Sequence, residues 1–122
     1  MSVIVTDAGF APEDHTGPIL DLASDTTPDA LDIAPGVRLV RIDFPSFADG
    51  RGFTLARLLR LRGYTGRLRA RGHVIADQYA MSRRSGFDEV EISDDLAARQ
   101  PEAQWLDRAQ WQAHDYQSRV RG

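Results

Sequence analysis

The stretch RLVRIDFPSFADGRGFTLARLLRLRG, residues 38–63, contains the pattern that decides the fold. Residues 38–44 alternate between apolar and polar side chains, which is typical of a β-strand, and Pro45 ends that strand. Residues 54–62 repeat leucine at the spacing of an amphipathic helix, with Thr54 as the expected N-cap and Gly63 as the expected C-cap. This stretch therefore predicts a strand, a loop and a helix in succession.

The same succession continues toward the C-terminus. Residues 66–71 and 87–93 are typical of strands, and residues 74–84 are typical of a helix that Gly86 ends. Ser93 or Asp94 is expected to cap a short turn after the last strand. A last helix is expected with Pro101 at its first position, packing Trp105, Leu106 and Ala109 and fading near Tyr116. The β-α-β-α-β-α order predicts an α/β fold with a small open parallel sheet of three or four strands, or a partial barrel. Residues 19–23 would supply the fourth strand, and a second copy could cover the sheet edge as a homodimer.

Length and composition set the outer limits. The 122 residues predict one α/β domain over residues 37–116, preceded by a loop-rich acidic segment, residues 1–36, with one strand, and followed by a frayed tail, residues 117–122. The chain has no cysteine, which excludes disulfides, thiol catalysis and cysteine-ligated metal clusters. No apolar run approaches the roughly 20 residues of a membrane span, and the first residues do not resemble a secretory signal. We therefore expect a cytoplasmic protein without membrane contact.

Charge is distributed unevenly along the chain. Residues 1–37 hold seven acidic residues and no arginine, whereas residues 38–84 hold eleven arginines and three acidic residues. All fifteen basic residues are arginine, which a GC-rich genome or selection for the guanidinium fork would explain. The acidic segment could fold over the basic centre, or could keep other anions away from it. Nucleic-acid binding is disfavoured, because the chain has a net charge of −3 and no recognition motif.

The loop with the sequence FPSFADGRG, residues 44–52, is the sharpest local feature. It links a strand to a helix, and such turns present backbone N–H groups to anions. The alternative is a tight turn stabilised by a local Asp49–Arg51 pair. We expect Gly50 or Gly52 in a conformation barred to other residues, and Arg51 and Arg69 at the same rim of the sheet.

The strand-end rule identifies three loops where binding groups should gather: residues 44–52, 71–73 and 93–95. Arg67, Arg69 and Arg71 share one strand face, so that face is solvated or these arginines meet carboxylates, for which Asp43 and Asp77 are candidates. His73 is more typical of a surface or capping residue than of a catalytic base. No metal-ligand spacing, nucleophile motif or cofactor motif occurs, so we expect no metal and no cofactor.

Four motifs together carry a resemblance to a known family: FPSFADGRG at residues 44–52, ARLLR at 56–60, GRLRARG at 66–72, and DQ at 77–78 followed by RRSGFD at 83–88. They resemble a proteobacterial family of unknown function whose members are described as probable oxidoreductases or accessory proteins of sulfite reduction and are encoded beside sulfite reductase. Arg67, His73 and Ser85 stand where relatives usually have Glu, Asp and Cys. The missing cysteine argues against a thiol mechanism.

The resemblance implies an accessory protein of assimilatory sulfite reduction that docks to sulfite reductase or binds a small oxyanion. The alternative is a small oxidoreductase or electron carrier of the same pathway, so enzymatic activity is left open and no catalytic residue is assigned. The anion- or partner-binding residues that the resemblance retains are Asp49, Gly50, Arg51, Gly52, Arg69, Asp77, Gln78 and Arg84.

Overall fold

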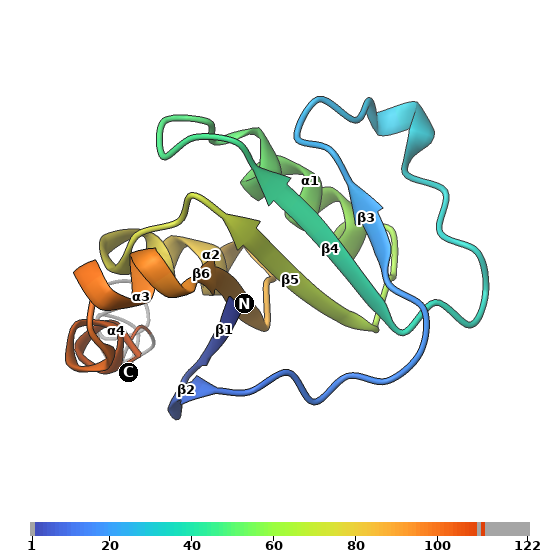
Figure 1. The fold of residues 1–122 in the computed structure, drawn as a ribbon. Helices are drawn as coiled ribbons and strands as arrows, with labels where there is room; N and C mark the ends of the chain where they lie inside the picture. The colour runs from blue at the N-terminus through green and yellow to red at the C-terminus, as the bar shows by residue number, and fades with distance from the viewer. Residues whose placement is uncertain (1, 110, 112–122) are drawn as a thin grey trace, which may run out of the picture.

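The computed structural model describes residues 2–109 and 111, which form a six-stranded sheet with four helices (Figure 1). The sheet order is β2-β1-β6-β5-β4-β3, so it is open, with β2 and β3 as its edges. The strands are β1 (Ser2–Thr6), β2 (Gly9–Ala11), β3 (Leu20–Leu22), β4 (Leu39–Phe44), β5 (Arg67–Gly72) and β6 (Glu89–Ser93). The helices are α1 (Arg51–Leu61), α2 (Tyr79–Ser85), α3 (Asp94–Arg99) and α4 (Glu102–Arg108), with 3₁₀ turns at Pro28–Ala30 and Ala76–Gln78.

The α/β class predicted from the sequence is confirmed, but the predicted strand count is wrong. Strands β3, β4, β5 and β6 pair in parallel, as the alternation of strands and helices indicated. Strands β1 and β2 add an antiparallel hairpin, and β1 pairs with β6. The sheet therefore has six strands and is mixed.

The hairpin lies in a segment whose glycine, proline and acidic residues predicted a loop. Asp7 and Ala8 form its turn, and Gly9 has a φ of 109° that a side chain would disfavour. Ile4 and Val5 are buried although β1 begins at the second residue of the chain. Strand β1 is stabilised by its pairing with β6. Because β1 and β6 are far apart in the sequence, this pairing leaves no local pattern from which the strand could be predicted.

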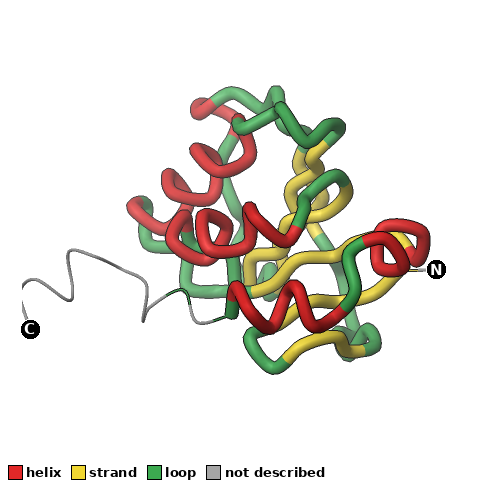
Figure 2. The backbone as a smooth tube through the Cα atoms, turned by 90° about the vertical axis from the view of Figure 1, so that its left-hand side faces the viewer, coloured by secondary structure: helices red, strands yellow, loops and turns green. Residues whose placement is uncertain are grey.

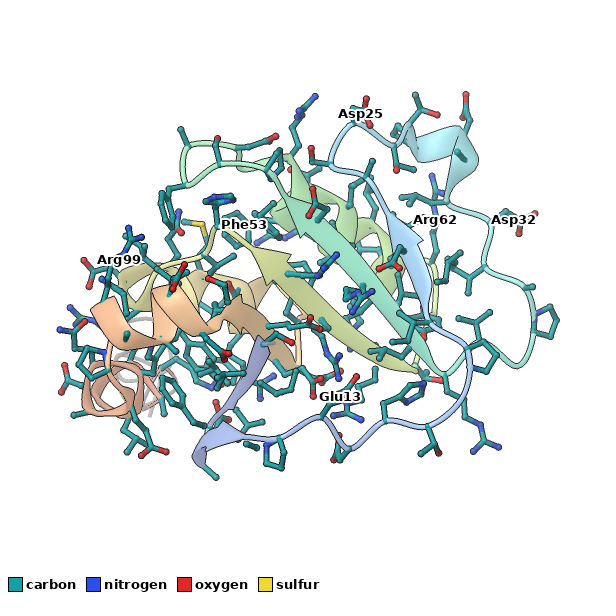
Figure 3. All side chains as sticks on the ribbon, viewed as in Figure 1. Glu13, Asp25, Asp32, Phe53, Arg62 and Arg99 are labelled. Atoms are coloured by element: carbon teal, nitrogen blue, oxygen red, sulfur yellow. The ribbon has the colours of Figure 1, made fainter. Side chains whose placement is uncertain are left out.

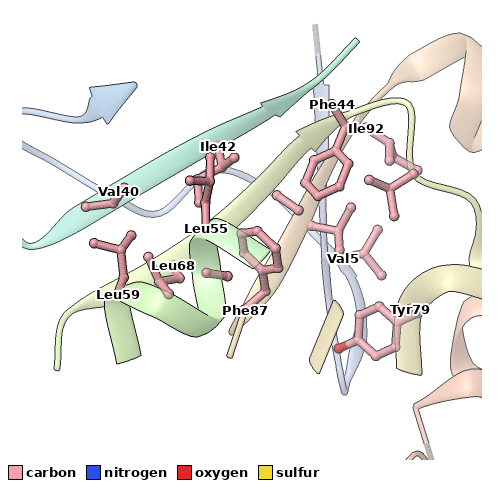
Figure 4. Close-up of a cluster of buried hydrophobic side chains, with 14 of the residues drawn as sticks. Val5, Val40, Ile42, Phe44, Leu55, Leu59, Leu68, Tyr79, Phe87 and Ile92 are labelled. Atoms are coloured by element: carbon pink, nitrogen blue, oxygen red, sulfur yellow. The ribbon is translucent and has the colours of Figure 1, made fainter. Parts of the chain in front are cut away.

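One face of the sheet carries the main hydrophobic core. The core on β4 consists of Val40, Ile42 and Phe44, which lie beside apolar residues of β5 and β6. Helix α1 covers these side chains with Leu55 and Leu59 (Figure 4). Figure 2 shows most of the helical segments on one side of the strands, with a helix also on the other side, beside the N-terminus. The period of two in the strands thus sends every second side chain into this core, and the remaining ones to the opposite face.

The predicted helices exist, with shifted boundaries. Helix α1 begins at Arg51 rather than after Thr54, and α2 is preceded by the 3₁₀ turn Ala76–Gln78. Gly63 and Gly86 both have positive φ beyond the ends of α1 and α2, and the Ser93 hydroxyl accepts a hydrogen bond from the Leu96 amide as N-cap of α3. In α4, Trp105 is buried but Leu106 is 40 % exposed. The predicted end near Tyr116 and the tail at residues 117–122 fall outside the described residues.

No helix within residues 2–109 and 111 has the length and apolar character needed to cross a membrane.

Gly52 is required for close packing, and the predicted unusual backbone conformation is wrong. Neither Gly50 nor Gly52 has a positive φ. A Cβ atom on Gly52 would lie 2.5 Å from Cζ of Phe44 and 2.7 Å from its Cε1. The Phe44 ring is itself buried between Phe53 and Phe87, with ring centroids 4.9 and 5.8 Å away, so it has little room to move.

We predict that Gly52→Ala destabilises the protein by about 1–3 kcal/mol, although alanine favours helices, because the core would be overpacked. Urea unfolding followed by circular dichroism measures the effect. Gly50→Ala is the matched control: its Cβ would meet only Phe53, at 3.8 Å, so its cost should stay below about 1 kcal/mol. An equal cost for both variants would contradict the packing argument.

Candidate functional site

The face of the sheet opposite α1 and α2 carries a network of buried charges. Its centre is Arg69 on β5, which has an exposed fraction of 0 %. Arg69 Nη1 and Nη2 donate to the two carboxylate oxygens of Glu13 at 2.8 and 2.6 Å. Arg69 Nη1 also donates to Glu91 at 2.9 Å, and its Nε donates to Glu89. The Arg69 guanidinium is therefore fully occupied within the protein.

Neighbouring arginines extend this network. Arg67 donates to Glu89 at 2.8 Å and to Asp14 at 2.7 Å. Arg41 of β4 donates to Asp21 at 2.6 and 3.0 Å and to Glu91 at 3.1 Å. The hypothesis that the acidic N-terminal segment folds over the basic centre is thus confirmed for these contacts. The candidates Asp43 and Asp77 do not pair with the β5 arginines.

Of the N-terminal carboxylates, Glu13 and Asp14 come from the connection between β2 and β3, and Asp21 lies in β3. That connection runs past the sheet in Figure 1, and Figure 3 labels Glu13 on it. Hydrogen bonds from Arg69 hold the pKa of Glu13 below its ordinary value, against the opposing effect of partial burial. Burial alone would lower the pKa of Arg69, but its bonds to Glu13 and Glu89 raise it above the usual value. Glu13 and Arg69 therefore both stay charged across the physiological pH range.

The loop of residues 44–52 has the local pair that was its alternative interpretation. Arg51 Nη2 and Nε donate to the Asp49 carboxylate at 2.7 and 3.0 Å, and the Arg51 amide donates to it at 3.1 Å. The Ser24 hydroxyl donates to the same carboxylate at 3.0 Å. These bonds, those to Arg51 first, lower the pKa of Asp49. Asp49 therefore neutralises the charge that was expected to attract an oxyanion.

The structure does not bring Arg51 and Arg69 together. Arg51 begins α1 and bonds to Asp49 and Ser24, whereas Arg69 lies buried in β5 and bonds to Glu13, Glu89 and Glu91. The expected shared rim is therefore wrong. Oxyanion binding by the loop itself stays a prediction.

The other site residues inferred from the resemblance have separate surroundings. Asp77 accepts a hydrogen bond from Arg108 at 2.8 Å. Gln78 accepts from the Ile75 amide at 3.0 Å and donates to the Phe47 carbonyl at 2.9 Å, which ties the start of α2 to the loop after β4. Arg84 is exposed, and its side chain has no hydrogen bond or ion pair with any residue in the described ranges 2–109 and 111.

A cavity of about 500 Å³ lies where β4, β5 and β6 end, and we call it the carboxyl-end pocket. It is lined by residues 2, 43–45, 71–73 and 91–93. Each of the three strand-end loops that the sequence identified thus contributes at least one residue to it. Parallel pairing brings these residues together, because Asp43 is the register partner of Arg71 and Arg71 that of Glu91.

Gly72 allows the ends of β4 and β5 to approach closely. It has a φ of 111°, and a Cβ there would lie 2.7 Å from the Phe44 carbonyl oxygen. That oxygen accepts a hydrogen bond from the His73 amide at 3.0 Å and lies 3.2 Å from His73 Nδ1. Because a carbonyl oxygen only accepts, Nδ1 is the donor in this contact, and Nε2 is the ring nitrogen left for a ligand.

The charged side chains Arg71 and Asp43 of the pocket have fewer or longer hydrogen bonds and ion pairs than the arginines of the buried network. Arg71 is about half exposed, and the one ion pair that it forms among residues 2–109 and 111, with Glu91, is 3.4 Å long. Asp43 is exposed and has no hydrogen bond or ion pair within the described part of the chain. The pocket therefore offers an available cation and an available anion side by side.

A larger cavity of about 910 Å³ lies between the connection from β3 to β4 and the end of α1. Leu31, Leu59 and Tyr64 contribute to its lining. It does not lie at the ends of the parallel strands, where binding groups of such sheets gather. None of the eight anion- or partner-binding residues implied by the resemblance lines either cavity. We therefore take the carboxyl-end pocket as the candidate ligand site. Among residues 2–109 and 111, no group of three His, Asp or Glu side chains is placed to hold a metal ion.

Fold and site define a small α/β protein whose mixed sheet has one apolar face under helices, one charged face, and a pocket at the carboxyl ends of its parallel strands. The chain belongs to the family described as "Bacterial protein of unknown function (DUF934)", whose model matches residues 20–122. No curated protein and no solved structure matches it. The match begins after Glu13 and Asp14, so these partners of the β5 arginines lie outside it.

We predict that Arg69→Leu destabilises the protein by about 3 kcal/mol or more, because Glu13, Glu89 and Glu91 would lose their common buried partner. Arg71→Leu, on the same strand but half exposed, should cost less than about 1 kcal/mol. Guanidinium chloride unfolding of both variants makes the comparison. Similar losses for the two would show that the network does not stabilise the sheet.

The lowered pKa of Glu13 predicts how stability depends on pH. Because its pKa is lower in the folded chain, its contribution is complete above the ordinary value of 4.5 and is lost as pH falls through the folded pKa. Glu13→Gln should therefore be less stable than wild type at neutral pH, and the difference should shrink in acid. Urea unfolding at about pH 7 and about pH 3 measures both differences. Asp32→Asn, at an exposed carboxylate unpaired within residues 2–109 and 111, is the control and should show no such trend. A constant difference for Glu13→Gln would contradict the prediction.

Proposed function

We propose that this protein is an accessory protein of sulfite reduction that docks to sulfite reductase through the outer face of α1 and α2. The observation that carries the docking part is a group of exposed side chains on these helices. Leu61 is 76 % and Met81 is 55 % exposed, beside two exposed arginines, Arg57 and Arg84. We call these four residues the docking face.

The spacing of the four residues places them on the outer side of the helical layer. Arg57 and Leu61 are one helical turn apart on α1, as Met81 and Arg84 are on α2, and residues of both helices that face the sheet are buried. The two helices contact each other. Arg60 at the end of α1 donates to the Gly86 carbonyl just beyond α2 at 3.0 Å, which fixes their relative position.

The charges of this face are available for a partner. Neither Arg57 nor Arg84 forms a hydrogen bond or ion pair through its side chain within the described residues, in contrast to Arg41, Arg67 and Arg69. Arginine and methionine are enriched in protein interfaces, and exposed apolar residues with a charged rim are typical of them. An acidic surface with an apolar centre would complement the docking face.

The resemblance in sequence supports sulfite reductase as the partner, since it implies a role beside that enzyme. Of the residues it singled out, Arg84 belongs to the docking face. Small-oxyanion binding by the loop of residues 44–52 is the weaker form of the proposal, because Asp49 occupies Arg51.

We predict that the purified protein binds sulfite reductase of the same organism in surface plasmon resonance. The double variant Arg57→Glu/Arg84→Glu should bind at least about tenfold more weakly, because both charges would face a like charge. The control Arg38→Glu/Arg99→Glu reverses two arginines that are also exposed and unpaired within residues 2–109 and 111 but lie on other elements, and it should bind as wild type does. Absence of wild-type binding, or equal loss in both double variants, would overturn the proposal.

A further inference from the structure

We propose that the carboxyl-end pocket binds a small zwitterion of the α-amino-acid type, with its carboxylate on Arg71 and its ammonium group on Asp43. Opposite charges of Arg71 and Asp43 stand on neighbouring parallel strands as direct register partners, with their side chains on the same face. They do not form an ion pair with each other, although such a pair would be the simplest way to satisfy both. Two unlike charges so close and so poorly satisfied fit a ligand that carries both complementary charges.

Arg71 is available because its neighbour is already engaged. Glu91 accepts hydrogen bonds from Arg41 at 3.1 Å and from Arg69 at 2.9 Å, and its contact with Arg71 is the longest of the three, at 3.4 Å. The half-exposed Arg71 side chain can therefore turn its fork toward a ligand carboxylate, a geometry that allows two parallel hydrogen bonds.

The carboxylate of Asp43 disfavours binding of a simple oxyanion in this pocket. A sulfate or phosphate held by Arg71 would lie beside the Asp43 carboxylate, with Glu91 also in the pocket lining, and would be repelled by both. A ligand with only an amine would be repelled by Arg71. A molecule that carries both groups on adjacent atoms avoids both repulsions and satisfies Asp43.

The remaining lining fits a ligand of this size and polarity. A volume of about 500 Å³ exceeds that of a small amino acid, so a ligand side chain and water also have room. His73 also lines the pocket, and because its Nδ1 is engaged by the Phe44 carbonyl, Nε2 is the ring nitrogen left for a ligand. The Ser93 hydroxyl accepts a hydrogen bond from the Leu96 amide, and its O–H remains a donor that adds to the contacts offered by Arg71, Asp43 and His73.

The test is a titration of the full chain, followed by ¹H–¹⁵N NMR and calorimetry, with four probes: L-serine, acetate, ethanolamine and sulfite. We expect L-serine to bind with shift changes at residues 43–45 and 71–73, and the other three to bind at least about tenfold more weakly. Arg71→Gln and Asp43→Asn should each weaken L-serine binding by about tenfold or more, while melting temperatures stay close to wild type because both side chains are exposed.

Arg38→Gln is the matched control, since it removes an exposed arginine that lies outside both the pocket and the docking face, and it should leave L-serine binding unchanged. Failure of L-serine to bind would overturn the proposal. Sulfite or acetate binding as tightly as L-serine would also overturn it, and would show a plain anion site, particularly if Asp43→Asn tightened that binding. The docking face shares no residue with this pocket, so loss of docking and loss of the zwitterion site are separable results.

Discussion

Burial of the Arg69 guanidinium is the constraint on which the rest of the sheet depends. A fully buried cation without partners would be far too costly to retain, so its neighbours must supply acceptors in fixed positions. Glu89 and Glu91 supply them from β6, and Glu13 supplies two more oxygens from the segment after β2. The ion pairs thereby fix the connection between β2 and β3 on the sheet.

This arrangement resolves a problem that parallel strands pose. Parallel sheets are usually covered by helices on both faces, but here α1 and α2 cover the apolar face. On the other face, arginines and carboxylates neutralise one another, and the connection between β2 and β3 covers part of these charged side chains. Ile4 and Leu39 are buried as well, but they do not belong to the main core cluster. The β1–β2 hairpin extends the same sheet, so the acidic N-terminal segment is part of the fold.

The sequence predicted what local periodicity encodes. Alternation in residues 38–44 and 66–71 located β4 and β5, and arginine at every second position of β5 indicated a charged face. It could not identify the partners of Arg69, because Glu13 is 56 residues away and no spacing rule links them. It named Gly50 or Gly52 and predicted an unusual backbone conformation, which is wrong; the close approach of Gly52 to Phe44 across the core leaves no mark in the local sequence.

The same charge network explains why the candidate site lies at the carboxyl ends of β4, β5 and β6. In the middle of β5, Arg69 reaches carboxylates on β6 and on the N-terminal connection, and nothing remains for a ligand. Two residues further along, the network ends: β6 terminates at Ser93, whose hydroxyl caps α3, and Glu91 is already shared. Arg71 on β5 and Asp43 on β4 are therefore the first charged side chains toward the carboxyl ends of these strands that the fold leaves weakly paired or unpaired among the described residues. A parallel sheet that satisfies its buried charges in its centre leaves recognition to the carboxyl ends of its strands.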